Sequence, residues 1–312
     1  MPTDLQVKPK DGGDVRSVRF QLKELLREPA PTNQNSDSKN MKHVLPSVAV
    51  TAVLGVAHAE PPVIVPLELH NHSSIVVATI EGQDVPLVFD LGDQTAVKLD
   101  QSVLDRIKAV PTGRSTKEVG LKGHVIEIPT YTVPLMRIGT AEFRNAIAQL
   151  SKYDPAYTPR KIGDQGALGT GLFKSYEVVF NYPNRTLTLV QRADGTPTSQ
   201  RCQGSPVPFS PEWHGEAVTT IDTDLGQLTV WWDTGTTTSV LSKRFVQRAR
   251  PNLTKDALTT QRLMIGTKNF GPMKFEIWEM ALPPGFDGFM GYSFFARHVV
   301  CIDYPDKQVL IR

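Results

Sequence analysis

Two stretches with the same build decide the fold: "LTVWWDTGTTTSVLS" at residues 228–242 and "VPLVFDLGDQTAVKL" at residues 85–99. In each stretch an apolar run ends in an aspartate, a glycine follows closely, and a second apolar segment comes after. The two aspartates are Asp233 and Asp90. A turn that recurs together with its flanking segments indicates an internal duplication, so the function of this chain concerns a pair of carboxylates.

Two further landmarks recur in the same order along the chain. The segment "MRIGTAEF" at residues 136–143 matches "LMIGTKNF" at residues 263–270. The segment "ALGTGLFKSYEVVFNYPNRTLTL" at residues 167–189 matches "FMGYSFFARHVVCIDYPDKQVLI" at residues 289–311. Each copy of this last landmark has the pattern of a strand, a Tyr-Pro turn and a returning strand. Three landmarks in one order predict two copies of the same β-lobe.

Composition is consistent with this prediction and excludes some classes of protein. The chain has 312 residues, of which 40% are hydrophobic and 21% charged, and its formal net charge is +2. It can therefore bury a sizeable core, and it has no charge excess that would favour nucleic acid. Short apolar runs interrupted by glycine and proline are typical of strands and turns. The sequence predicts an all-β protein with one lobe in residues 60–198 and another in residues 199–312.

The residues before the first lobe have the features of an export signal. Residues 41–59, "MKHVLPSVAVTAVLGVAHA", contain Lys42, an apolar run and a terminal Ala-His-Ala, which predict a signal peptide cleaved before Glu60. A membrane anchor is the alternative, but the apolar run is shorter than the roughly 17 residues that cross a bilayer. Residues 1–40 are polar, and they are either a disordered tail or the product of a start codon placed too far upstream. We expect a secreted or periplasmic protein with no stable membrane span after cleavage.

If the protein is exported, the two cysteines of the chain, Cys202 and Cys301, lie in an oxidising environment. An oxidising compartment would allow them to form a disulfide, but a pair of buried thiols remains the alternative because sequence cannot show that the sulfurs meet. The cysteines do not have the spacing of a metal site. His70 and His72 lack an evident third ligand, so we expect neither a metal nor another cofactor.

The landmarks together resemble those of the retropepsin-like and pepsin-like aspartic proteases, here as two tandem lobes in one chain of an exported, bacterial type. The resemblance rests on apolar-apolar-Asp-Thr-Gly, on Ile-Gly, on apolar-apolar-Gly and on the terminal Asp-Tyr-Pro-Asp hairpin. It implies two closed β-barrel lobes related by a pseudo-twofold axis, with Asp90 and Asp233 as catalytic residues at the floor of a cleft. The active-site loops would then contain Leu91, Gly92, Asp93, Thr234, Gly235 and Thr236.

The chemistry that this resemblance implies follows from the proximity of two carboxylates. Two such groups cannot both ionise cheaply, so they share a proton, and one activates a water while the other donates a hydrogen bond to the peptide carbonyl. The sequence therefore predicts a monomeric aspartic endopeptidase that acts on peptides or proteins. Leu91 leaves a second hypothesis open, because the family has a hydroxyl there that ties the two loops together. Without that hydroxyl, one hydrogen bond between the loops is lost, at a cost of about 1 kcal/mol. The second hypothesis is therefore a catalytically impaired peptide-binding module.

Two other features of the first lobe depart from its repeat. Asp93 stands where the second lobe has Thr236, and it would raise the proton affinity of the pair if it points inward; alternatively it faces the amides of its own loop. The first lobe is also longer around residues 115–133, where Gly120 and Gly123 indicate a hairpin tip. The resemblance implies that this hairpin is a flap over the cleft, and a solvent-facing hairpin is the alternative.

Overall fold

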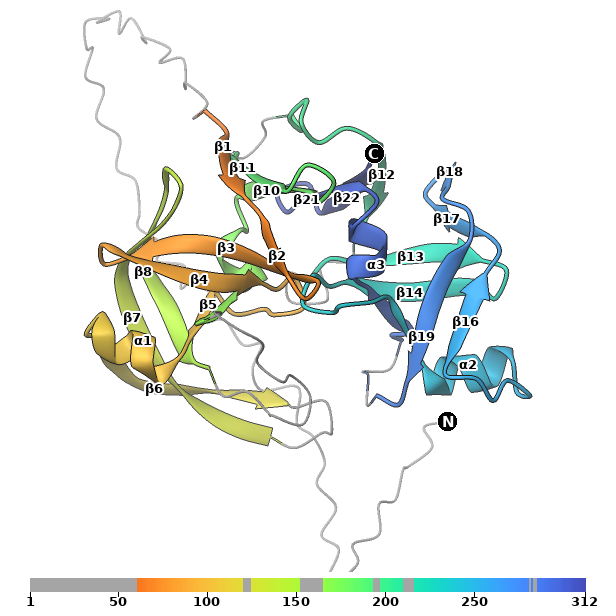
Figure 1. The fold of residues 1–312 in the computed structure, drawn as a ribbon, viewed down its shortest axis with the longest axis horizontal. Helices are drawn as coiled ribbons and strands as arrows, with labels where there is room; N and C mark the ends of the chain where they lie inside the picture. The colour runs from red at the N-terminus through yellow and green to blue at the C-terminus, as the bar shows by residue number, and fades with distance from the viewer. Residues whose placement is uncertain are drawn as a thin grey trace, which may run out of the picture. The chain divides into compact units, whose positions relative to one another are not determined.

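The structure is a computed structural model that describes residues 61–119, 125–151, 165–192, 197–209, 216–280, 282 and 285–312, all of which belong to one compact unit. Strands make up most of these residues, and the helices are few and short (Figure 1). The predicted tail at residues 1–40, the predicted signal peptide at residues 41–59 and the predicted hairpin-tip residues Gly120 and Gly123 lie outside the described residues.

An eight-stranded sheet forms the first lobe. In sheet order its strands are β2 (Glu68–His70), β3 (Ser73–Ile80), β4 (Gln83–Phe89), β9 (Gly166–Leu168), β5 (Val97–Leu99), β8 (Ala141–Leu150), β7 (Val125–Ile138) and β6 (Val110–Val119). Because β3 also pairs with β7, the strands from β3 round to β7 close into a barrel. Helix α1 (Gln101–Arg106) follows β5, and the 3-10 helix η1 (Thr170–Leu172) follows β9.

In the second lobe, a second eight-stranded sheet has central strands in the equivalent order, here listed from the opposite edge. Its strands are β16 (Ala257–Thr260), β19 (Met273–Trp278), β15 (Val240–Ser242), β20 (Gly288–Met290), β14 (Gly226–Trp232), β13 (Val218–Thr223), β17 (Leu263–Ile265) and β18 (Lys268–Asn269). Strands β18 and β19 together take the place of β8, so this barrel closes through the short loop between them. Helices α2 (Lys243–Ala249) and α3 (Tyr292–Phe295) follow β15 and β20. The predicted all-β, two-lobed fold is confirmed.

The strands that lead into the two aspartates share one burial pattern. In β4 the side chains of Val85, Leu87 and Phe89 are buried and alternate with more exposed neighbours, and β14 alternates in the same way up to Trp232. Successive side chains of a strand point to opposite faces, so alternation of this kind directs every second residue into the core. Each aspartate therefore follows a strand that is firmly anchored in its own barrel.

A third sheet joins the two halves of the chain. Its six strands are, in order, β1 (Val63–Pro66), β11 (Thr186–Gln191), β10 (Tyr176–Asn181), β21 (Val299–Asp303), β22 (Gln308–Ile311) and β12 (Ser205–Pro208). Three strands come from each half, and the antiparallel pair of β10 with β21 is the seam between them. The predicted Tyr-Pro hairpins are the β10–β11 and β21–β22 hairpins of this sheet.

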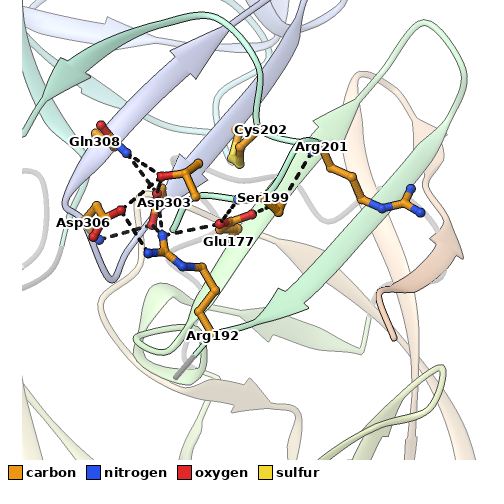
Figure 2. A network of polar contacts seen from close by, with 10 residues as sticks. Glu177, Arg192, Ser199, Arg201, Cys202, Asp303, Asp306 and Gln308 are labelled. Atoms are coloured by element: carbon orange, nitrogen blue, oxygen red, sulfur yellow. Dashed lines mark hydrogen bonds and ion pairs between the residues drawn. A yellow bond between two sulfur atoms is a disulfide. The ribbon is translucent and has the colours of Figure 1, made fainter. Parts of the chain in front are cut away.

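A buried ion network crosses this seam (Figure 2). The guanidinium of Arg192 lies 2.7 Å from a carboxylate oxygen of Asp303, 3.0 Å from Asp306 and 3.3 Å from Glu177. The side chains of Glu177 and Asp303 are fully buried, and Glu177 also accepts a hydrogen bond from the amide of Ser199 at 2.6 Å. A buried charge is tolerated only when it is paired, so these contacts satisfy the carboxylates of β10 and β21.

A disulfide joins Cys202 to Cys301 in the same region, with their α-carbons 5.5 Å apart. Both cysteines are buried beside Val179 and Leu310, so the bond ties the start of the second half to the joining sheet. Among the described residues, no helix is both long and apolar enough to span a membrane.

Candidate active site

The loops that carry Asp90 and Asp233 begin at equivalent places in the two barrels. The amide of Asp90 donates to the carbonyl of Leu168 in β9 at 2.9 Å, and the amide of Asp233 donates to the carbonyl of Met290 in β20 at 3.0 Å. Strands β4 and β9 run parallel, as do β14 and β20. Each aspartate is thus fixed where a pair of parallel strands ends, and the two halves place their carboxylates by the same construction.

The glycine of each loop packs against the carboxylate of the other loop. A β-carbon added to Gly235 would lie 2.6 Å from Cγ of Asp90, and one added to Gly92 would lie 2.8 Å from Cγ of Asp233. Real β-carbons do not approach other atoms so closely, so a side chain at either position would displace the opposite carboxylate. This reciprocal contact brings the two loops face to face and sets the two carboxyl groups beside each other.

Backbone amides hold the carboxyl pair, and the surroundings raise the pKa of both acids. The Gly92 amide donates to Oδ1 of Asp90 at 2.8 Å, and the Gly235 amide donates to Oδ1 of Asp233 at 2.7 Å. Burial, then the charges of Asp233 and Asp93, raise the pKa of Asp90 well above its ordinary value. Burial also raises the pKa of Asp233, but backbone amides and a hydrogen bond from Asp90 oppose that rise. The hydrogen bond between the two acids raises the pKa of Asp90 and lowers that of Asp233, which favours Asp90 as the proton donor of the pair.

Thr234 ties the second loop to the first. Its hydroxyl accepts a hydrogen bond from the Leu91 amide at 3.1 Å and donates to the carbonyl of Phe89 at 2.5 Å. Both partners belong to the opposite lobe and flank Asp90. Thr234 is fully buried, so this contact is shielded from water and fixes the separation of the two aspartates.

Leu91 has no hydroxyl to make the reciprocal contact, and its side chain is fully buried in the hydrophobic core. Another bond crosses the interface at this residue instead. The indole nitrogen of Trp231 donates to the carbonyl of Leu91 at 3.2 Å. Trp231 packs against Phe286 and Phe289, which orient its ring. The first loop is therefore tied to the second lobe by the indole of Trp231, two residues before Asp233, and not by a hydroxyl at position 91.

Asp93 does not point only at its own loop. One carboxylate oxygen accepts from the amide of Thr95 at 2.9 Å, and the other forms an ion pair with Nζ of Lys98 at 2.8 Å. Lys98 also pairs with Glu118 of β6 at 2.9 Å. Asp93 thus stabilises its turn and still adds negative charge near Asp90, so features of both interpretations of Asp93 are present. Thr236, its counterpart, donates to the carbonyl of Asp233 at 3.1 Å.

A chain of hydrogen bonds also holds the carbonyl of Phe89, the residue before Asp90. The hydroxyl of Tyr182 donates to the hydroxyl of Ser74 at 3.0 Å, and Ser74 donates to the carbonyl of Phe89 at 3.2 Å. This is the same carbonyl that Thr234 binds. The sequence predicts a hairpin turn at Tyr182, but nothing in a single sequence pairs Tyr182 with Ser74, which is 108 positions away.

The hairpin of the first lobe is described only along its stem. Strands β6 and β7 pair from Val110 with Thr132 to Val119 with Val125, and the predicted tip lies beyond the described residues. Glu118 and Lys98 connect this stem to the loop of Asp93.

The two histidines considered as metal ligands make contacts with different residues. His70 faces Glu68 at 3.3 Å, whereas the ring of His72 stacks on that of Tyr292 with the centroids 4.5 Å apart. Across the described ranges, no group of three or more His, Cys, Asp or Glu side chains has the arrangement of a metal site.

Comparison with known proteins supports the fold and no more than the fold. No protein-family model and no curated protein matches the chain. Among solved structures, the crystal structure of an aspartic proteinase from Irpex lacteus matches with a TM-score of 0.56 and 14% identity, covering 80% of this chain and 97% of that one. The chain therefore has the fold of a pepsin-like aspartic proteinase.

Proposed function

We propose that this protein is an exported aspartic endopeptidase that hydrolyses peptide bonds with Asp90 and Asp233. The observation that carries the proposal is the reciprocal packing of Gly92 and Gly235 on the opposite carboxylates, which sets the two acids within hydrogen-bonding distance. Asp90 is half-buried and Gly235 is exposed, so the pair stands at the surface of the interface rather than inside a sealed core.

The protonation of the pair assigns the roles in hydrolysis. Ionised Asp233 takes a proton from a bound water, and the resulting hydroxide attacks the peptide carbonyl carbon. Asp90 donates its proton to the carbonyl oxygen, which gives a neutral tetrahedral intermediate. When the carbon–nitrogen bond breaks, Asp233 gives its proton to the leaving nitrogen and Asp90 recovers a proton from the intermediate. The cycle restores both groups and involves no covalent enzyme intermediate.

The altered first motif does not argue strongly against catalysis. Removal of one hydrogen bond between the loops costs about 1 kcal/mol, and the Trp231 contact to Leu91 offsets a loss of that size. Thr234 retains the remaining tie, and both aspartates are present. This favours the enzyme over the catalytically impaired peptide-binding module.

The cellular setting is part of the same proposal. The signal-like residues 41–59 and the disulfide between Cys202 and Cys301 both suit a secreted or periplasmic protein. We propose that the chain acts as a monomer on peptides or proteins, since one chain supplies both halves of the acid pair.

A peptide-library cleavage assay from acid to neutral pH tests the function. We expect the wild-type protein to cleave and the Asp90→Asn and Asp233→Asn variants to be silent. Asp222→Asn, an exposed aspartate of β13, is the matched control and should cleave like wild type. Peptide binding without cleavage at any pH would instead establish the binding module.

A further inference from the structure

Glu216 is a buried acid that the proposed mechanism does not use. It lies just before β13, and only 2% of its surface is exposed. Its Oε1 accepts a hydrogen bond from the side-chain amide of Gln94, which belongs to the first lobe and follows Asp93 directly. The two residues thus bridge the lobes beside the loop that carries Asp90.

The groups that face Glu216 come from three elements. Asp93 lies on the first active-site loop, Asp233 on the second, and Tyr304 at the turn between β21 and β22. Asp93 is paired with Lys98, so its charge is partly balanced, whereas Asp233 has no such cation among the contacts described above. A charge on Glu216 therefore interacts with Asp93 and with Asp233 of the carboxyl pair.

Pseudosymmetry shows that this corner of the second lobe differs from the first. Ser74 and Ala217 occupy equivalent places. Ser74 donates to the carbonyl of Phe89, and the carbonyl of Ala217 accepts from the amide of Trp232, so each contacts the last residue of the strand that leads to its aspartate. In the first lobe Tyr182 bonds to Ser74, but the buried hydroxyl of Tyr304 has no hydrogen-bond partner in the described part of the chain. Glu216 lies near this unsatisfied hydroxyl, and the first lobe has no acid at the equivalent position, which is Ser73.

The protonation of Glu216 depends on the same surroundings. Burial, together with the charges of Asp93 and Asp233, raises its pKa to about 7, although the hydrogen bond from Gln94 acts in the opposite direction. Glu216 is therefore neutral in acid and ionises as the solution approaches neutrality.

We propose that Glu216 is a positioning residue of the active site, which holds the first loop through Gln94 and, when ionised, helps the carboxyl pair to retain its shared proton. This inference rests on the proposed function. Ionised Glu216 adds a negative charge near Asp233, and a like charge makes proton loss from the pair less favourable. The residue thereby extends the active protonation state toward higher pH.

The first test measures kcat and KM against pH for wild type and Glu216→Gln, with a peptide found in the library assay. We expect the alkaline limb of the kcat profile to move to lower pH by on the order of one unit in the variant, with KM little changed. Glu279→Gln, an exposed glutamate, is the matched control. Superimposable wild-type and Glu216→Gln profiles would overturn the proposal.

The Gln94→Leu variant tests the bridge separately. It keeps the acid of Glu216 and removes its donor, so we expect a lower kcat at every pH and a higher pKa for Glu216. An unchanged kcat would show that the bridge does not position the loop.

An infrared titration supplies a readout that needs no catalysis. We expect a carboxylic-acid carbonyl band that disappears near neutral pH in wild type and is missing from Glu216→Gln. If the protein proves unable to cleave peptides, the proposed function fails while this titration still decides whether Glu216 ionises near neutrality. A band that shows Glu216 already ionised in acid would overturn the inference.

Discussion

At the scale of single residues, the geometry of the acid pair depends most on Thr234. Its one hydroxyl satisfies a donor and an acceptor of the opposite lobe, at Leu91 and Phe89, inside a buried interface. The other loop has Leu91 at the equivalent position and no hydroxyl there, so Thr234 makes both of these hydrogen bonds between the loops.

We expect Thr234→Val to lower the free energy of unfolding by about 1–3 kcal/mol, because the same-sized side chain leaves the Leu91 amide unsatisfied. Activity should fall further than stability alone explains, since the two aspartates lose their fixed separation. Urea unfolding and kcat/KM measure the two effects. Thr237→Val, an exposed position on the same loop, is the control and should change neither. Equal behaviour of the two variants would contradict this role for Thr234.

Glu216 also makes a prediction for stability. Its ordinary pKa is 4.5, and the fold raises that pKa to about 7. Between these values the folded protein keeps a proton that the unfolded chain has released, so stability falls as the pH rises through this window. A shift of that size corresponds to up to about 3 kcal/mol.

Glu216→Gln should remove this part of the slope. The stability of wild type relative to the variant is expected to decrease from about pH 4.5 to about pH 7 and to level off above that. Urea unfolding at a series of pH values gives the comparison. Parallel stability curves would show that Glu216 does not titrate abnormally in the fold.

At the scale of elements, the seam between β10 and β21 depends on the pairing of its buried charges. Arg192 contacts Glu177 and Asp303, whose side chains have no exposed surface (Figure 2). A buried ion pair adds little net stability by itself, but removal of one partner leaves the other charge unpaired and is strongly destabilising.

Arg192→Met is therefore expected to lower the free energy of unfolding by about 3–5 kcal/mol at neutral pH. The deficit should shrink in acid, where the stranded carboxylates take up protons. Arg201→Met is the control, because Arg201 is exposed and its side chain lies outside the ion pairs drawn in Figure 2. A loss no larger than that of the control would mean that the network does not hold the seam.

The elements around the aspartates could be predicted because duplication left two copies of the same pattern. β4 and β14 each alternate buried and exposed residues up to an aspartate, and the two Tyr-Pro turns recur in the hairpins of the joining sheet. Local patterns of this kind are set by the period of a strand and by turn chemistry, and both can be read from a single sequence.

The contacts that adjust the site could not be predicted in the same way. Trp231 with Leu91, Gln94 with Glu216 and Arg192 with Asp303 each join residues from different halves of the chain. None of these pairs has a repeated counterpart in the sequence, so no symmetry argument points to them. The interruption of β8 into β18 and β19 in the second lobe is also invisible as a pattern.

At the scale of the whole molecule, the disulfide adds a covalent tie to the joining sheet. Cys202 and Cys301 are 99 residues apart in sequence, and closing a loop of this length restricts the unfolded chain by up to about 4–5 kcal/mol in the chain-entropy account.

We expect a Cys202→Ala, Cys301→Ala variant to lose about 2–4 kcal/mol of stability while it keeps its circular dichroism spectrum, because β10 and β21 still pair. Wild type unfolded in reductant should match the variant. Equal stability of oxidised wild type and the variant would contradict a contribution from this bond.

The central claim is that two duplicated halves place Asp90 and Asp233 where they share one proton. Carbon-13 NMR of labelled aspartate side chains, followed through a pH titration in wild type and in Asp90→Asn, measures this most directly. We expect two linked ionisations in wild type, one far above the ordinary aspartate range, and a single ionisation at lower pH for Asp233 in the variant. Two independent ionisations at ordinary values, with that of Asp233 unchanged by the substitution, would contradict the account.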